Sequence, residues 1–317
     1  MKEYPSYLKL LDEGRLKERI DKIFSLIEEC KLCPRVCGVN RLKGEKGVCR
    51  TGKMAIVSSF GPHFGEESPI SGFNGSGTIF FTNCNLKCIF CQNYSISHLG
   101  EGEEVTPEEL KDMMLSLQRK ECHNLNLVSP THQVPQILEA LYLALKEGFS
   151  LPIVYNSGGY DSVETLRILD GIVDIYMPDA KYGDLKIGEE LSLIPDYFEV
   201  NKLALAEMHK QVGDLELDKN GVAIRGLLVR HLVLPNGLSG TSEVMRFIAN
   251  EISPSTYVNL MDQYYPCFKG VTHPLLGRRI TFKEYLGALE IMKKEGVSLR
   301  GVEERYLYLF DSLEDIK

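Results

Sequence analysis

Short apolar runs alternate with longer amphipathic stretches along most of this chain, from about residue 76 onward. Six of the apolar runs have the length and the β-branched or aromatic content of buried strands. They cover residues 77–82, 124–129, 151–156, 172–177, 226–233 and 256–261. Uninterrupted apolar runs are typical of strands in a parallel sheet that helices cover on both faces. The pattern therefore predicts βαβ units and the α/β fold class.

The stretches between these runs have helical spacing. Helices are expected to begin at Thr106 and at Asp161 or Ser162, and to cover residues 134–147, 198–211, 242–250 and 282–294. Thr106 is the clearest start, because this capping residue is followed by Pro107 and two acids.

The first 55 residues differ from this pattern. Apolar side chains lie on one helical face of residues 15–29, which predicts an amphipathic helix packed on the main domain. Cysteines and a loop rich in glycine and lysine follow. We expect residues 1–55 to form this helix and a cysteine-rich metal-binding module, and residues 56–317 to form the α/β domain with a C-terminal extension.

Charge and composition exclude several classes of function. The net charge is −8 and the pI is near 5.5, and the basic residues are spread out. Because nucleic-acid binding needs a basic surface, no nucleic-acid partner is expected. No apolar stretch has the length of a membrane span, and residues 1–5 lack the order of a secretion signal. We therefore expect no membrane partner and a cytoplasmic location, where clustered cysteines more often bind metal than form disulfides.

Cys84, Cys88 and Cys91 lie close together on the loop that follows the first expected strand. Three thiolates can hold three corners of a cubane [4Fe-4S] cluster, and they leave one iron without a protein ligand. A closed structural site uses all its positions, so the open iron implies that another group binds there. Three buried structural thiols, or disulfide partners, are the alternative.

Cys30, Cys33, Cys37 and Cys49 form a second set. Four cysteines complete a tetrahedral ligand set, so this site is expected to be closed. We expect a second metal centre here, with iron–sulfur favoured over zinc. A reduced-thiol loop without metal, or a disulfide-bonded loop, is the alternative.

The triplet spacing, with Phe90 before the last cysteine, resembles the motif of the radical S-adenosylmethionine (SAM) superfamily. Three further segments resemble the pyruvate formate-lyase activating enzyme and its relatives. Cys91-Gln92-Asn93 is similar to their Cys-His-Asn, residues 156–160 to their Thr-Asn-Gly-Tyr, and Asp179-Ala180-Lys181 to their Asp-Leu-Lys. Arg230 matches the position of an arginine that contacts SAM.

This resemblance covers residues 75–265 or so and implies a partial (β/α)6 TIM-like barrel. The cysteine-rich segment is then a small N-terminal extension of the barrel. In parallel α/β barrels the chemistry gathers at the carboxyl ends of the strands. The extra four cysteines precede the triplet instead of following it, which is typical of a branch of activating-enzyme-like proteins with an N-terminal four-cysteine motif.

The resemblance also implies which residues contact SAM. Phe90 is placed to cover the adenine, with a core phenylalanine as the alternative. Asp179 can accept from the ribose, and Lys181 and Arg230 can bind the carboxylate or ribose edges. An ion pair at the rim is the alternative for these three.

Asn93 and Asn156 are further expected cofactor contacts because they lie in the matching motifs. The family's Gly-Gly-Glu, which receives the SAM amino group, is replaced here by residues 129–132, Ser-Pro-Thr-His. Because oxygen atoms accept ammonium hydrogens, the role is transferred to Ser129 and Thr131.

The roles of several other reactive side chains remain open. His63, Glu66 and Glu67 lie in a glycine- and proline-rich loop, where they contact substrate or the second centre, or are simply solvated. His132 and His231 are expected at strand ends, with a structural role favoured over proton transfer. Cys267 is a hydrogen-atom or thiolate donor, or a plain buried thiol.

The sequence as a whole predicts an oxygen-sensitive radical SAM oxidoreductase. It is expected to cleave SAM reductively to a 5′-deoxyadenosyl radical, with flavodoxin or ferredoxin as electron donor. The substrate is either a glycine on a glycyl-radical partner protein, or a small molecule or peptide. Hydrogen abstraction requires no acid or base side chain, so no catalytic residue is assigned. An iron–sulfur electron carrier or a zinc-stabilised interaction module is the non-catalytic alternative.

Overall fold

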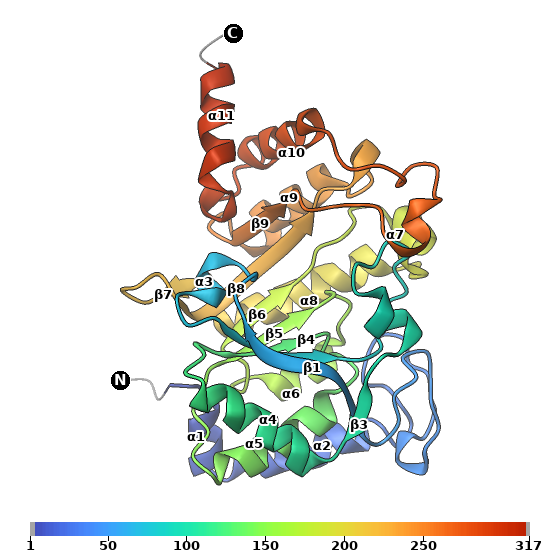
Figure 1. Ribbon diagram of the computed structural model, residues 1–317, viewed down its shortest axis with the longest axis vertical. Coiled ribbons are helices and arrows are strands. Elements are labelled where there is room, and N and C mark those ends of the chain that lie inside the picture. The colour runs from blue at the N-terminus through green and yellow to red at the C-terminus, as the bar shows by residue number, and fades with distance from the viewer. Residues whose placement is uncertain (1–3, 315–317) are drawn as a thin grey trace.

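A computed structural model describes residues 4–314 of the chain, and six parallel strands form its centre (Figure 1). These strands are β2 (Ser76–Phe81), β4 (Leu125–Val128), β5 (Ile153–Ser157), β6 (Ile175–Pro178), β8 (Ala223–Leu232) and β9 (Tyr257–Met261). They are paired in this order, and every pair is parallel. The structure confirms the α/β class and the partial (β/α)6 barrel.

One edge of the sheet is antiparallel. β1 (Ala55–His63) pairs with β2 on one side and with β3 (Glu103–Val105) on the other. A short strand, β7 (Glu216–Leu217), forms a hairpin with β8. None of these three was expected from the sequence. β1 loses its burial after Val57 and contains a glycine and a proline, so it lacks the continuous apolar run of the parallel strands.

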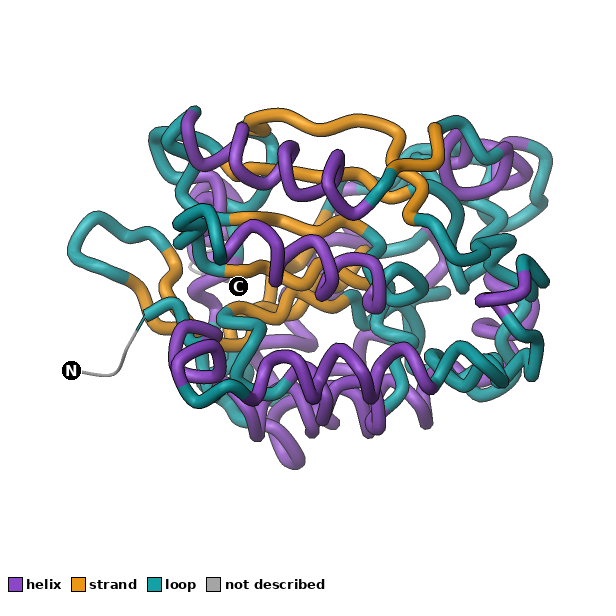
Figure 2. Tube along the Cα trace, turned by 90° about the horizontal axis from the view of Figure 1, so that it is seen from below, coloured by secondary structure: helices purple, strands orange, loops and turns teal. Residues whose placement is uncertain are grey.

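Helices pack against the sheet, and Figure 2 shows a row of them below the strands. Six of them match the expected positions: α4 (Pro107–Arg119), α5 (Val134–Leu145), α6 (Val163–Leu169), α8 (Tyr197–Val212), α9 (Thr241–Phe247) and α10 (Phe282–Lys294). Thr106 and Thr281 each complete a capping box with a glutamate three residues on, which fixes the starts of α4 and α10. Four other helices were not expected: α1 (Tyr7–Asp12), α3 (Ser68–Ser71), α7 (Leu185–Ser192) and α11 (Glu304–Glu314).

The N-terminal segment packs on the barrel's helices. α2 (Arg15–Ser25) lies against α5 and α6, and Leu16 and Ile23 belong to the same apolar core as the barrel. The Thr165 hydroxyl on α6 donates to the Leu32 carbonyl at 2.7 Å. The division into residues 1–55 and 56–317 stays a prediction. In residues 4–314 no helix combines the length and the apolar character needed to cross a bilayer.

Candidate active site at the carboxyl ends of the strands

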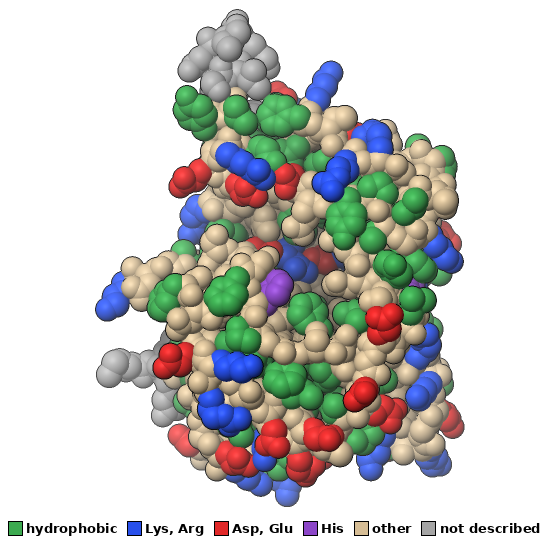
Figure 3. All heavy atoms as spheres, viewed as in Figure 1, with side chains coloured by type: hydrophobic (Ala, Val, Ile, Leu, Met, Phe, Trp, Pro, Cys, Tyr) green, Lys and Arg blue, Asp and Glu red, His purple; other side chains and the backbone are tan. Residues whose placement is uncertain are grey.

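A cavity of ≈ 1460 Å³ opens where the parallel strands end. Its walls come from the loops after β2, β4, β5 and β6, from β8 and β9, and from the end of β1. In Figure 3 the molecule is hollowed near the middle of the view, with basic and acidic side chains inside the hollow. The structure thus places a large recess at the edge of the sheet where the sequence predicts the chemistry.

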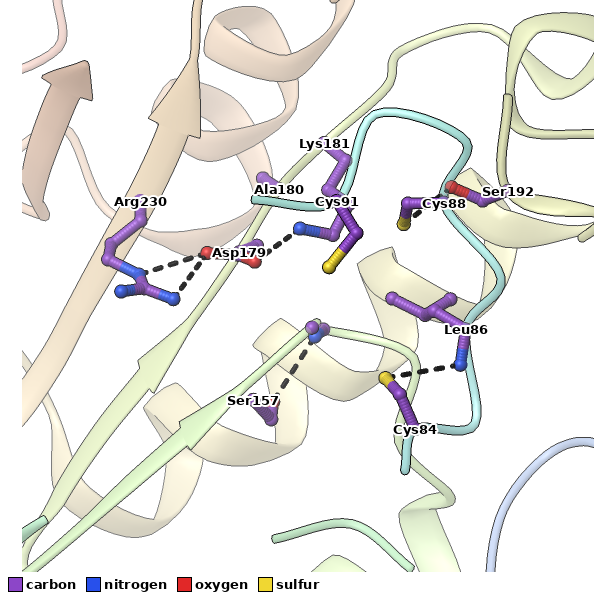
Figure 4. A network of polar contacts seen from close by, with 12 residues as sticks. Cys84, Leu86, Cys88, Cys91, Ser157, Asp179, Ala180, Lys181, Ser192 and Arg230 are labelled. Atoms are coloured by element: carbon purple, nitrogen blue, oxygen red, sulfur yellow. Dashed lines mark hydrogen bonds and ion pairs between the residues drawn. The ribbon is translucent and has the colours of Figure 1, made fainter. Parts of the chain in front are cut away.

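The loop after β2 carries the cysteine triplet along one wall of this cavity. Figure 4 shows the sulfur atoms of Cys84, Cys88 and Cys91 turned toward a common space beside Lys181. Backbone hydrogen bonds fix the loop: Lys87 N donates to the Ser192 carbonyl at 3.2 Å, and Ile89 N to that of Leu191 at 2.9 Å. The end of α7 therefore clamps the middle of the loop.

Each of the three sulfur atoms has a polar neighbour. The Leu86 N–H donates to Cys84 Sγ at 3.4 Å, and the Ser192 hydroxyl donates to Cys88 Sγ at 2.9 Å. Cys91 Sγ lies 3.1 Å from the Ser97 hydroxyl. Sequence reasoning missed Ser192, and nothing near it in the chain signals this contact, because α7 meets the loop only in the folded protein.

The chemistry of this donor set fits a cluster. Burial, together with the neighbouring Cys88 thiol, raises the pKa of Cys84 to about 12, and burial also raises the pKa of Cys91. A set of buried thiolates therefore needs positive charge beside it. Three cysteines share one cavity wall, and the described residues that line this cavity include no fourth cysteine, which fits a [4Fe-4S] cluster with one open iron.

Asp179, Lys181 and Arg230 form one charged group in the cavity wall (Figure 4). Lys181 Nζ pairs with Asp179 Oδ2, and Arg230 Nη2 lies 2.8 Å from Asp179 Oδ1. Burial alone would raise the pKa of Asp179, but Arg230 and Lys181 outweigh it and hold the pKa below its usual range. Burial alone would lower the pKa of Lys181, but Asp179 outweighs it and raises the pKa, so the group keeps one net positive charge.

The segment after β4 is divided between the cavity and the protein interior. Ser129 has a left-handed backbone, with φ of 57°, and lines the cavity, as does Asn156 at the end of β5. Thr131 is buried away from the cavity lining, and its hydroxyl donates to Asp161 at 2.7 Å. Ser157 and Tyr155 also donate to this buried carboxylate, so Asp161 holds the ends of β4 and β5 together.

Phe90 and Asn93 also line the cavity. Phe90 is only 6% exposed, and its ring packs edge-on against Tyr182 and Tyr264, with centroids 6.4 and 5.9 Å away. It therefore belongs both to the apolar core and to the cavity wall. Of the eight expected cofactor contacts, the structure brings all but Thr131 to this cavity.

His63, Glu66 and Glu67 lie in the same cavity wall, His63 at the end of β1 and the two glutamates on the segment between β1 and α3. His63 Nδ1 is 3.5 Å from Glu66 Oε1, and Glu67 accepts a hydrogen bond from Asn259 at 2.9 Å. Burial raises the pKa of Glu66, although Arg230 opposes it. This acidic segment gives the cavity more room and more functional groups than the SAM contacts alone require.

The other candidate side chains lie outside the lining of the large cavity. His231 is buried, with Nδ1 2.6 Å from the Ala180 carbonyl and Nε2 3.0 Å from the Thr241 hydroxyl, and burial lowers its pKa to about 4. His132 is buried next to the start of the cysteine loop, with Nε2 2.8 Å from the Thr82 carbonyl. Cys267 begins a short turn and is not part of the cavity wall.

The second cysteine set surrounds a separate, small cavity of ≈ 10 Å³. All four of its cysteines, Cys30, Cys33, Cys37 and Cys49, line this cavity and carry free thiols. Gly47 lets the backbone pass close to Cys37, because a Cβ atom at position 47 would lie 2.7 Å from Cys37 Sγ. Residues 4–314 contain no set of three cysteine, histidine or carboxylate groups arranged as a ready site for a single ion.

Comparison with known proteins adds to this geometry. Residues 78–200 match the family model described as the radical SAM superfamily. The chain is 34% identical over 293 residues to the uncharacterized protein MJ0674 of Methanocaldococcus jannaschii, covering 90% of this chain and 79% of the relative. It is 22% identical over 263 residues to the uncharacterized protein MJ0808 of the same organism, covering 76% and 71%.

Three solved structures are also similar. A radical SAM methyltransferase from Sphaerobacter thermophilus has a TM-score of 0.46 at 14% identity and covers 69% of this chain and 64% of its own. HydG, a maturase of the [FeFe]-hydrogenase, has a TM-score of 0.45 at 12% identity, covering 95% and 60%. Methylornithine synthase (PylB) has a TM-score of 0.44 at 18% identity, covering 68% and 60%.

The family model spans the cysteine loop, most of β2, and β4, β5 and β6, whose ends build part of the cavity. This chain therefore contains a domain of the radical SAM superfamily. The domain implies a [4Fe-4S] cluster and SAM as its cofactors.

Proposed function

We propose that the chain is an enzyme that abstracts a hydrogen atom from a substrate bound in the large cavity beside SAM. The observation that carries this proposal is the meeting of three elements in one cavity wall: the cysteine triplet, the charged group of Asp179 and its two cations, and further lining residues that the cofactor does not need. An electron carrier has no use for such a recess.

The chain's own residues divide the work. Cys84, Cys88 and Cys91 would hold the cluster, which supplies the electron that splits SAM into methionine and a 5′-deoxyadenosyl radical. Lys181 and Arg230 orient the SAM carboxylate, because the net positive charge of their group faces the cavity. The apolar wall at Phe90 excludes water from the adenine side.

Ser129 and Asn156 present oxygen atoms at the same end of the cavity and suit the SAM amino group. Thr131 contributes indirectly, since its hydroxyl anchors Asp161 beneath these residues. Asn93, two residues after Cys91, is also in the lining. These roles follow from placement and chemistry.

Two substrate classes remain, and a different observation supports each. The motifs that resemble the pyruvate formate-lyase activating enzyme favour a glycine on a glycyl-radical partner protein. Glu66 and Glu67, in contrast, favour a small molecule or peptide with a positively charged group, because their carboxylates line the cavity beyond the SAM contacts. Flavodoxin or ferredoxin is the proposed electron donor for both.

Anaerobic reconstitution with iron and sulfide, followed by dithionite and SAM, tests the core of this proposal. The wild type should release 5′-deoxyadenosine, and the variant with Cys84, Cys88 and Cys91 all changed to alanine should release none. Cys122→Ser is the matched control, because Cys122 is buried outside both cavities. A loaded, reducible wild type that fails to cleave SAM with every candidate substrate would refute the proposal.

Deuterium transfer then separates the two substrate classes. A glycine α-deuterium appears in 5′-deoxyadenosine only if the partner protein is the substrate. For a cationic small molecule, Glu66→Gln should raise KM while leaving the uncoupled cleavage of SAM unchanged. Air exposure of the loaded protein should abolish activity in both cases.

A further inference from the structure

The four cysteines of the N-terminal segment line one small cavity together with Arg35 and Arg41. Four thiolates at one place can hold either a single zinc ion or an iron–sulfur cluster. The buried donors around the cavity distinguish the two.

Buried positive charge without a partner surrounds the same cavity. Arg41 is 1% exposed; its Nε and Nη2 donate to the Gly52 carbonyl, and its Nη1 is buried without an acceptor. Arg35 Nη2 is likewise buried without a partner, and both arginine side chains line the four-cysteine cavity. Within residues 4–314 no acidic side chain pairs with Arg41.

A buried guanidinium without a counter-charge is costly, and so is each unpaired N–H group. An anionic cluster bound by four thiolates supplies both the charge and additional sulfur acceptors for these donors. Hydrogen bonds of this kind to cluster sulfur are one of the ways in which proteins set the potential of an iron–sulfur centre. The surroundings of this cavity therefore complement a cluster.

Side chains of the N-terminal segment also form hydrogen bonds to the residues on both sides of Cys84. Arg50, the residue after Cys49, donates from Nη2 to Asn83 Oδ1 at 2.9 Å, and Asn83 directly precedes Cys84. Both bridging residues have left-handed backbones, with φ of 53° for Arg50 and 70° for Asn83. Arg35 Nε donates to the Asn85 carbonyl on the other side of Cys84, at 3.0 Å.

His132 adds a third link, because it lines the four-cysteine cavity and its Nε2 lies 2.8 Å from the Thr82 carbonyl. One of these routes runs from Cys49 through Arg50 and one hydrogen bond to Asn83 and Cys84. Each set of cysteines is therefore connected to the other through side chains, backbone and a single hydrogen bond.

We propose that Cys30, Cys33, Cys37 and Cys49 hold an iron–sulfur cluster that passes single electrons to the cluster at Cys84, Cys88 and Cys91. A low-potential protein donor of the flavodoxin or ferredoxin class gives one electron to the N-terminal cluster and is itself oxidised by one electron. The N-terminal cluster returns to its oxidised state when that electron moves to the second cluster. No proton and no further reactant is needed. The relay rests on the proposed function; the presence of the cluster does not.

The first experiment tests occupancy on the full chain. The variant with Cys84, Cys88 and Cys91 changed to alanine is reconstituted anaerobically, and iron, sulfide and zinc are counted alongside Mössbauer spectra. We expect about two or about four irons with equal sulfide, the counts of the two cluster types that four cysteines bind. Zinc without iron, or no metal, in a folded variant would overturn the proposal.

The second experiment tests the relay, by comparing two reductants in wild type and in the variant with all four N-terminal cysteines changed to serine. Reduced flavodoxin should reduce the Cys84 cluster at least about tenfold more slowly in the variant, while dithionite, which can enter the open cavity directly, should act at a similar rate. The reduced cluster is followed by its electron paramagnetic resonance signal. Equal flavodoxin rates would overturn the relay.

A uniform loss with both reductants, accompanied by loss of iron at the triplet, would show a structural role instead and would also overturn the relay. Arg50→Met guards against misfolding of the cysteine variant, since it leaves every cysteine in place. It should slow reduction by flavodoxin severalfold with unchanged iron content. Failure of wild type to cleave SAM with dithionite is a separate result, and it would count against the proposed function alone.

Discussion

Ser192 offers the sharpest test of how the fold controls the proposed catalytic cluster. Its hydroxyl donates to Cys88 Sγ at 2.9 Å, and the hydroxyl of Tyr182 lies 2.7 Å from Ser192 Oγ, so Tyr182 donates to Ser192 in turn. All three residues are buried. In Ser192→Ala, Cys88 loses this donor while the cysteine loop keeps its backbone hydrogen bonds to the end of α7.

The direction in which Ser192→Ala shifts the reduction potential follows from the charge of the cluster. A hydrogen bond to sulfur strengthens when the cluster gains an electron, so its removal disfavours the reduced state and lowers the reduction potential. Hydrogen bonds to charged groups contribute about 1.5–3 kcal/mol. If about half of this separates the two redox states, the shift is roughly 0.7–1.5 kcal/mol, or about 30–65 mV for a one-electron couple.

The assay is a potentiometric titration of the reconstituted protein, followed by electron paramagnetic resonance. The four-cysteine serine variant serves as the background, so that a single cluster is observed. Tyr182→Phe is the matched control: it keeps the Ser192 donor and removes only the polarising neighbour, so its shift should be a small fraction of the first. An unchanged or raised potential in Ser192→Ala, with full iron content, would refute the reasoning.

Three further predictions concern SAM binding, pH and backbone geometry. Arg230→Met should weaken SAM binding about 10- to 100-fold in equilibrium dialysis with iron content unchanged, because a charged hydrogen bond is lost, whereas Arg225→Met on the same strand, bonded to Ser6 and Gln211, should have little effect. His231 has its folded pKa lowered to about 4 by burial, so the unfolded chain binds its proton first; the free energy of unfolding should fall by up to about 3 kcal/mol as pH drops from about 6.5 to about 4. Urea denaturation should show a shallower pH dependence for His231→Asn, and an equal one would contradict this assignment. Gly159→Ala should destabilise by about 3 kcal/mol or more, since its Cβ would lie 2.0 Å from the Asp179 carbonyl at a φ of 73°; Gly148→Ala, at a φ of 84° with open space, should cost only about 1 kcal/mol, and similar melting temperatures for the two would count against the argument.

The sequence predicted the parallel strands well because β4, β5 and β6 are buried on both faces, and this burial leaves nearly continuous apolar runs. The capped helices were equally legible: α10 begins and ends where its pattern predicts, and Thr281 completes its capping box. β1 was missed for the converse reason. It turns polar beyond Val57, so only its pairing with β2 identifies it as a strand.

Most of the cofactor contacts that the sequence predicts, but not all of them, meet in one cavity. Those that lie at strand ends within a motif, such as Asp179 and Asn156, were predicted to share a site, and they line one cavity. Thr131 was predicted on the same grounds, but Ser129 takes a left-handed backbone and the chain then turns the Thr131 hydroxyl inward to Asp161. A motif gives the position of a residue along a strand but not the turn that follows.

The contacts around Cys84 connect the two sets of cysteines, which no sequence motif predicts. In the sequence, 34 residues lie between Cys49 and Cys84, and nothing there connects the two cysteine sets. In the fold, Arg50 and Arg35 reach the residues on either side of Cys84, while Arg41 stays buried beside the other four cysteines without an acidic partner among the described residues. If the N-terminal segment only stabilised the barrel, an apolar residue would fill the place of Arg41 at lower cost. A buried cation next to four thiols suits the proposed anionic cluster, and Arg35 and Arg50 connect this site to the loop that holds the proposed catalytic cluster.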